Sequence, residues 1–262
     1  MSDAGQDLSR EERAALAELA LRLGDDRLIL GHRLSEWCGH APVLEEELAL
    51  ANLALDCLGH ASTLLALAGE LEGRSRSADA LAFLRDAREF RNCLLVEQPN
   101  GDFAATMVRQ LLFDQADLLY YEGLQASRHA GLAAFAAKAA QEIRYHLRHA
   151  RAWWLRLGDG TEESHRRMEA ALEELWRFTG ELFAMDELER SLLAAGLAPD
   201  RAALEPGWRE ELRAVTVQAA LHLPESANVH AGGGRRGIHG ECLGHLLAEM
   251  QVLARTHPGA TW

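Results

Sequence analysis

The sequence predicts an all-α protein. Ala, Leu, Glu and Arg dominate its 262 residues, whereas the β-favouring Val, Ile, Thr and Tyr are sparse. Apolar residues recur with a helical period from one end of the chain to the other. Nothing in the composition splits the chain convincingly, so we expect residues 1–262 to form a single domain.

The first part of the chain predicts three helices. The first spans 10–38 and is broken at 39–42, and the second, which is unusually apolar in its middle, spans 43–73. After a short polar link, residues 77–98 read as one shorter helix, which the Pro-Asn-Gly turn at 99–101 stops.

The second part predicts five more helices, with Asp102 as the N-cap of the first and Thr161 or Ser164 as a cap further on. Their expected bounds are 102–127, 130–158, 161 to about 195 with a bend, 206–222, and 240–258. Four long helices in two pairs, with shorter ones around them, are typical of a ferritin-like helical bundle with extra peripheral helices. A helical array without a central site is the alternative that the lengths leave open.

Charge and cysteine content narrow the function classes. The formal net charge of −13 argues against nucleic acid, whose phosphates would be repelled, and against anionic membrane surfaces. The four cysteines form no CxxC pair, which favours a reduced compartment. The charged N-terminal stretch is unlike a signal peptide, and no apolar run approaches the ~20 residues that span a bilayer, so we expect a cytoplasmic location.

Polar residues on the apolar helices suggest the outline of a metal site. Di-iron carboxylate bundles use a carboxylate on one helix and Glu-x-x-His on the next, twice over. The candidates here are Glu36, His60, Asp114 and His146, and Asp114 stands out because it lies in the apolar run "LLFDQADLL". Three residues before the two histidines, where the motif needs glutamate, stand Cys57 and Ile143.

Several stretches carry a resemblance to a known family: "SEWCGHAP", "LDCLGHA", "LLVEQPNGDFAATMVRQ" and "EIRYHLRHARAWWLRLGDGT". They resemble the non-catalytic, ferritin-like PaaC-type subunits of bacterial phenylacetyl-CoA epoxidases (ring 1,2-epoxidases). The likeness spans nearly the whole chain. It implies a partner, the related catalytic subunit PaaA, which holds the di-iron centre, and a separate reductase subunit that supplies electrons.

The same resemblance implies that this chain lacks catalytic residues and a di-iron cofactor of its own. Both bridging glutamates are replaced, by Cys57 and Ile143, and two divalent irons with only Glu36 and Asp114 as carboxylates would leave buried positive charge uncompensated. Two interpretations remain. The polar residues pair with one another and replace the cofactor, or one divalent ion binds Glu36, His60, Asp114 and His146.

The expected role is therefore that of a structural subunit that stabilises the di-iron catalytic subunit. Two alternatives are an independent metalloenzyme that uses a mononuclear metal, and a helical scaffold unconnected with phenylacetate. A separate motif is the glycine-rich segment 229–241, where Arg235 and Arg236 precede a helix and suggest a contact with the phosphate of coenzyme A. A flexible connection explains the glycines equally well.

Overall fold

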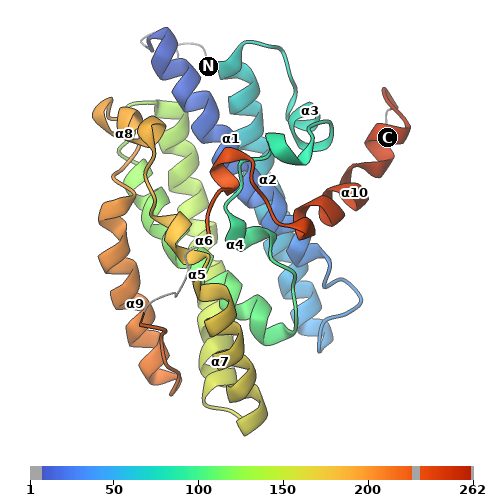
Figure 1. The fold of residues 1–262 in the computed structure, drawn as a ribbon, viewed down its shortest axis with the longest axis vertical. Coiled ribbons are helices and arrows are strands. Elements are labelled where there is room, and N and C mark those ends of the chain that lie inside the picture. The colour runs from blue at the N-terminus through green and yellow to red at the C-terminus, as the bar shows by residue number, and fades with distance from the viewer. Residues whose placement is uncertain (1–7, 226–230, 261–262) are drawn as a thin grey trace. The chain divides into compact units, whose positions relative to one another are not determined.

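The computed structural model describes residues 8–225 and 231–260, and its contacts divide the chain into two compact units. Unit 1 comprises Met1–Ser9 and Asn100–Ala231, and unit 2 comprises Arg10–Pro99 and Gly232–Trp262. The described residues form ten α-helices and short 3₁₀ helices, with no strand (Figure 1). The all-α class is confirmed. The single domain expected from the sequence stays a prediction, and each unit is described by itself.

Unit 2 is built on a helical hairpin of α1 (Arg10–Ser35) and α2 (Leu44–Glu72). The two helices approach closely because α1 carries glycines at their contact. A Cβ placed on Gly24 would lie 2.9 Å from Leu65 Cδ2, and one on Gly31 would lie 3.2 Å from Ala54 O. The later glycine of α1, Gly31, contacts the earlier residue of α2, Ala54, and Gly24 contacts the later residue, Leu65. The two helices are therefore antiparallel.

Shorter elements complete unit 2, and here one prediction was wrong. Residues 77–98 do not form one helix but three short pieces, namely α3 (Ala78–Phe83), the 3₁₀ helix η1 (Ala87–Glu89) and α4 (Leu94–Glu97). The C-terminal segment of unit 2 adds η4 (Gly234–Arg236) and α10 (Glu241–Thr256).

The physical reason for the break is that two carboxylates of α1 accept backbone hydrogen bonds from this segment. The N–H of Arg91 donates to Asp25 Oδ2 at 2.8 Å, and the N–H of Cys93 donates to Asp26 Oδ1 at 2.7 Å. Those N–H groups therefore need no helical partner, and the chain can run in a non-helical path across α1.

Unit 1 is built on a second antiparallel hairpin, α5 (Phe103–Leu124) and α6 (Ala130–Gly158). The direction follows from cross-helix pairs: Glu122 meets Arg144 at 2.7 Å, and Gln115 meets Arg151 at 2.5 Å. The predicted cap is confirmed, because the carboxylate of Asp102 accepts a hydrogen bond from the N–H of Ala105.

Unit 1 continues with shorter helices whose bounds are α7 (Glu162–Trp176), η2 (Thr179–Leu182), α8 (Glu187–Ala194), η3 (Ala202–Leu204) and α9 (Glu205–Gln218). Thr161 caps α7, as predicted, with Ser164 in a capping box. The single bent helix expected over 161 to about 195 is instead two helices, because the Thr179 hydroxyl donates to Trp176 O and Asp186 caps a new start. Two long hairpins with peripheral helices match the predicted ferritin-like bundle class.

The apolar character of α2 is stronger than the sequence reading allowed. By length and composition alone, this helix is long and apolar enough to cross a membrane, and a part of its apolar stretch is buried inside the structure. Its buried face packs on α1 and includes Leu53, Cys57 and Leu64. A helix in the core of a folded protein can have the same length and the same apolar composition.

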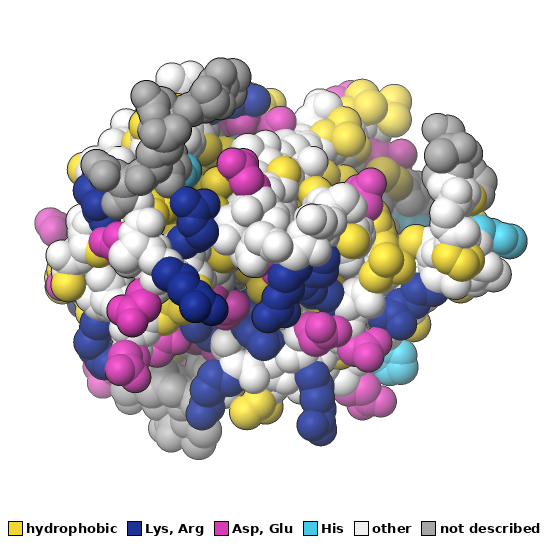
Figure 2. All heavy atoms as spheres, turned by 90° about the horizontal axis from the view of Figure 1, so that it is seen from above, with side chains coloured by type: hydrophobic (Ala, Val, Ile, Leu, Met, Phe, Trp, Pro, Cys, Tyr) yellow, Lys and Arg dark blue, Asp and Glu magenta, His cyan; other side chains and the backbone are white. Residues whose placement is uncertain are grey.

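Figure 2 shows one face of the molecule, on which basic and acidic side chains lie interspersed.

Candidate functional site

Two of the sequence-predicted site residues lie on the buried face of α2 in unit 2. Cys57 is fully buried and His60 is 4% exposed, so both point inward as predicted. The neighbour of Cys57 is not a metal ligand but a cation, because the guanidinium of Arg27 on α1 lies 3.7 Å from the Cys57 sulfur (Nη1 to Sγ) and is itself fully buried. A fixed positive charge at this position disfavours a metal ion.

Glu36, the expected carboxylate of the first helix, follows the last residue of α1, Ser35. Its side chain is 39% exposed and pairs with Arg33, with the Nη1–Oε1 distance at 2.7 Å. Arg33 also donates to the backbone carbonyls of Glu97 and Cys242 at 2.9 Å and 3.1 Å. The Glu36 carboxylate thus pairs with a guanidinium that connects the end of α1 to the end of α4 and the start of α10.

The other two predicted residues face each other in unit 1. Asp114 on α5 and His146 on α6 are both fully buried, with His146 Nδ1 3.9 Å from Asp114 Oδ2. The same carboxylate oxygen accepts a hydrogen bond of 2.5 Å from Gln110, one helical turn away. Ile143, three residues before His146, is fully buried and gives an apolar wall where a glutamate would be needed.

These donor sets do not fit a di-iron centre. Such a centre needs two Glu-x-x-His pairs, and the glutamate positions hold Cys57 beside a buried guanidinium and the apolar Ile143. Within the described part of each unit, no group of three or more His, Cys, Asp and Glu side chains is arranged to hold a metal ion. The arrangement of Gln110, Asp114 and His146 is instead a buried polar cluster.

The sequence reading missed a network of buried charges in unit 2. Asp25 on α1 forms a bidentate pair with Arg85, whose Nη1 lies 2.9 Å from Asp25 Oδ2, and both side chains are almost fully buried. Burial raises the pKa of Asp25, although the Arg85 guanidinium opposes this rise. The pair connects α1 to the segment after α3.

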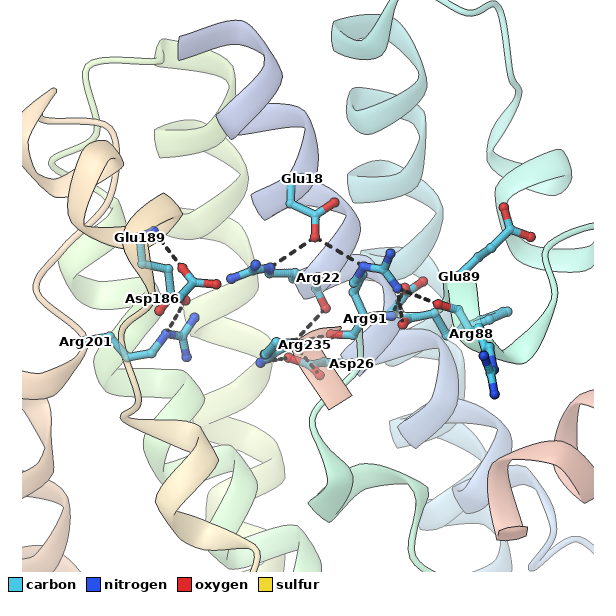
Figure 3. A network of polar contacts seen from close by, with 12 residues as sticks. Glu18, Arg22, Asp26, Arg88, Glu89, Arg91, Asp186, Glu189, Arg201 and Arg235 are labelled. Atoms are coloured by element: carbon cyan, nitrogen blue, oxygen red, sulfur yellow. Dashed lines mark hydrogen bonds and ion pairs between the residues drawn. The ribbon is translucent and has the colours of Figure 1, made fainter. Parts of the chain in front are cut away.

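Asp26, the next residue on α1, binds the glycine-rich segment. Arg235 donates to both oxygens of Asp26 at 2.7 Å and 3.0 Å, and to the carbonyl of Arg91 at 2.8 Å; Figure 3 shows the two side chains facing each other. Residues 234–236 form an ordered 3₁₀ turn rather than a flexible connection. Val229 and His230, the start of the predicted motif, lie outside the described residues. The phosphate contact expected of Arg235 and Arg236 stays a prediction.

A third buried carboxylate, Glu97, holds the start of α10. It accepts hydrogen bonds from Asn92 Nδ2 at 2.9 Å and the N–H of Gly240 at 2.7 Å, and His239 Nδ1 lies 2.7 Å from it. Burial, assisted by the nearby Glu97 charge, raises the pKa of the Cys242 thiol. This cysteine is therefore a weaker nucleophile than an ordinary thiol at neutral pH.

One signal in the sequence could have revealed part of this network. "RLGDDRLIL" places Asp25 and Asp26 in an apolar stretch, which is the same feature that singled out Asp114. Their partners Arg85 and Arg235 lie 60 and 209 residues away and carry no local signal. The network binds loops to α1, and its carboxylates are all engaged by donors, so it is a structural arrangement.

The two helical hairpins, with shorter helices around them, define an all-α protein of the ferritin-like helical-bundle class. The chain belongs to the phenylacetic acid catabolic protein family, whose model matches residues 1–262. It is similar to the C subunit of 1,2-phenylacetyl-CoA epoxidase from Escherichia coli strain K12, with 49% identity over 247 residues that cover 94% of this chain and 99% of the relative. The family resemblance predicted from the sequence is confirmed.

Proposed function

We propose that this chain is a non-catalytic structural subunit of a multicomponent epoxidase that acts on phenylacetyl-CoA in phenylacetate catabolism. The observation that carries the proposal is the end-to-end similarity, at 49% identity, to a protein named as one subunit of such an enzyme. In this role the chain binds and stabilises the di-iron catalytic subunit, PaaA, while a reductase component supplies electrons. The expected location is the cytoplasm, without nucleic acid or membrane as partner.

The donor chemistry of both units supports a subunit without its own di-iron centre. A buried guanidinium beside Cys57 supplies fixed positive charge, and Ile143 supplies no donor atom. Asp114 is already engaged by Gln110 at 2.5 Å. Bringing two divalent cations to such residues would require the loss of these contacts and would leave charge uncompensated in a poorly solvated interior.

A surface suited to a partner subunit lies on α2. Leu44, Leu48 and Leu55 are 67%, 58% and 65% exposed and lie on one side of the helix, because their spacing of four and seven residues brings them back to the same face. Exposed apolar stripes of this kind mark protein interfaces. We therefore assign this stripe, defined by the three leucines, to the contact with the catalytic subunit.

The first experiment compares the purified chain alone with the chain co-expressed with its catalytic partner. We expect no epoxidation of phenylacetyl-CoA by the chain alone with reductase, O₂ and NADPH, and near-zero iron by inductively coupled plasma mass spectrometry. With the catalytic subunit we expect a co-purifying complex and a higher unfolding temperature of that subunit. Turnover by the chain alone, or stoichiometric metal that a His60→Ala/His146→Ala variant loses, would favour an independent metalloenzyme.

The second experiment tests the stripe. Leu48→Asp/Leu55→Asp places two charges at the centre of an apolar contact, so we expect the catalytic subunit to stop co-purifying. The matched control is Val217→Asp on α9, which is also an exposed apolar residue, at 72%. Unchanged co-purification of the double variant would contradict the assigned surface, and loss in both variants would show a general effect of added charge. Binding of the unmodified chain to lipid vesicles would assign the stripe to a membrane instead.

A further inference from the structure

Unit 2 contains a cavity of about 640 Å³ that no part of the proposed function uses. It lies between the 3₁₀ helix η1 and the segment that leads from η4 into α10. Arg88 comes from the first wall, and Arg236, Ile238 and His245 come from the second. A cavity of this size accommodates a small organic ligand.

The two arginines of the cavity differ from the other arginines around them. Arg22, Arg91 and Arg235 are each paired with a carboxylate of α1, as Figure 3 shows. The guanidinium groups of Arg88 and Arg236 are exposed and, among the described residues, have no ion pair or hydrogen bond. In a chain with a net charge of −13, two such arginines beside the single carboxylate of Glu241 leave the cavity lining with a positive balance.

The cavity is also lined by one acid, Glu241, and by two histidines, His239 and His245. Glu241 lines the wall at the start of α10, and its Oε1 lies 3.5 Å from His245 Nε2. The start of α10 is already engaged, because the N–H of its N-cap Gly240 donates to Glu97 Oε1 at 2.7 Å, so the positive character of the cavity comes from the two arginines.

The two walls are held together before any ligand arrives. Gly237 has a φ of 74°, and a Cβ at this position would lie only 2.1 Å from the carbonyl oxygen of Arg88, so the backbones that carry both arginines are in close contact. Arg235 anchors the same turn to Asp26 at 2.7 Å, and His239 Nε2 lies 3.0 Å from the carbonyl of Phe90. A site with preformed walls loses little entropy on binding.

We propose that this cavity binds the phosphate groups of a nucleotide-type ligand. Arg88 and Arg236 would hold the phosphates, because guanidinium groups form paired, charge-assisted hydrogen bonds with phosphate oxygens. Ile238, which is 59% exposed, gives an apolar surface for the base. The source of the ligand rests on the proposed function: the adenosine 3′,5′-bisphosphate end of a coenzyme A thioester has this chemistry, and so does a free nucleotide.

The test is isothermal titration calorimetry of the full-length chain, without its partner, with coenzyme A, adenosine 3′,5′-bisphosphate, ATP, adenosine and inorganic phosphate. We expect the phosphorylated nucleotides to bind and adenosine not to bind. Arg88→Gln/Arg236→Gln should weaken nucleotide binding at least about tenfold, since both charge-assisted contacts are lost. Coenzyme A and the bisphosphate binding more tightly than ATP would identify the thioester as the source, and equal binding would identify a general nucleotide site.

The matched control is Arg74→Gln/Arg190→Gln, which removes the same charge from two exposed arginines that do not line the cavity and should leave binding unchanged. Both double variants alter exposed side chains, so their unfolding temperatures should equal that of the unmodified chain. The proposal is overturned if no nucleotide binds, if adenosine binds equally well, or if both double variants weaken binding alike. None of these results depends on assembly with the catalytic subunit, so failure here is distinguishable from failure of the proposed function.

Discussion

The two units stabilise similar helical hairpins by different means. In unit 2, adjacent carboxylates on α1 form buried pairs with arginines of distant segments, Asp25 with Arg85 and Asp26 with Arg235. Unit 1 also contains a buried ion pair, but the core of this unit is built on aromatic rings. Trp208 stacks on Trp176 at 5.5 Å between centroids and donates from Nε1 to the carbonyl of Leu112 at 3.0 Å.

The difference follows from what each unit must hold in place. The extra elements of unit 1 are mainly helices, which satisfy their own backbone and need only an apolar surface to pack on. The extra elements of unit 2 include the irregular residues around Arg91, whose N–H groups find no helical partner and are satisfied by Asp25 and Asp26. These two carboxylates of unit 2 are therefore buried where irregular backbone crosses α1.

The largest expected effect is on unit 2. Arg85→Met leaves Asp25 buried without its guanidinium, which should lower the free energy of unfolding by about 3–5 kcal/mol. Urea denaturation measures the loss in free energy of unfolding for the whole chain. Hydrogen exchange should be faster at the N–H groups of Arg91 and Cys93. Arg85→Met/Asp25→Leu should lose less than the single variant, because no charge stays unpaired. A loss no larger than that of the exposed Arg74→Met would contradict this account.

The same variant gives a test by pH. Burial already raises the pKa of Asp25, and removing Arg85 removes the largest influence that opposes the rise. The folded Arg85→Met variant then binds the proton more tightly than its unfolded chain, so its stability is greater at low pH and is lost as the pH rises through the folded-state pKa. We expect the difference in free energy of unfolding between the variant and the unmodified chain to become smaller as the pH is lowered from neutral to ~5. A constant difference would mean that Asp25 is not the group affected.

An intermediate effect is expected in unit 1. Trp208→Phe removes part of a fully buried ring and the hydrogen bond to Leu112 O, which should cost about 1–3 kcal/mol. Hydrogen exchange should speed up in α5 and α9 and stay unchanged at Arg91. The matched control is Trp153→Phe, at a half-buried tryptophan, with a smaller loss. Equal changes in both units would mean that their stabilities are not separable.

The smallest effect concerns an ion pair near the surface of unit 2. The hydrogen bond from Arg76, with Nη2 and Oε2 2.5 Å apart, lowers the pKa of Glu72. A lowered folded-state pKa gives stability that is present above the ordinary glutamate pKa and is lost as the pH falls through the lowered value. Glu72→Gln should therefore cost only about 0.5 kcal/mol at neutral pH and less in acid. Thermal unfolding as a function of pH measures this, and a loss that grows in acid would contradict the assignment.

The candidate site was predicted in part. Asp114 was expected inside the protein because it lies in an apolar helical run, and His146 because its helical position matches a metal-binding motif; both are fully buried. That Cys57 and Ile143, and not glutamates, stand three residues before His60 and His146 is read directly from the sequence. That Arg27 lies at the Cys57 sulfur was not predicted, because residues on different helices meet at a register that side-chain packing decides.

The sequence alone determined the helices and their caps, such as Asp102 and Thr161, because helix formation and capping depend on residues within four positions of one another. It also determined the family and the identity of the residues, Cys57 and Ile143, that precede the two histidines by three. Only the tertiary structure decided that residues 77–98 break into short pieces and that Arg235 closes on Asp26. Those outcomes depend on hydrogen bonds between groups up to 209 residues apart, and their energies exceed the local preference for helix only once the chain has folded.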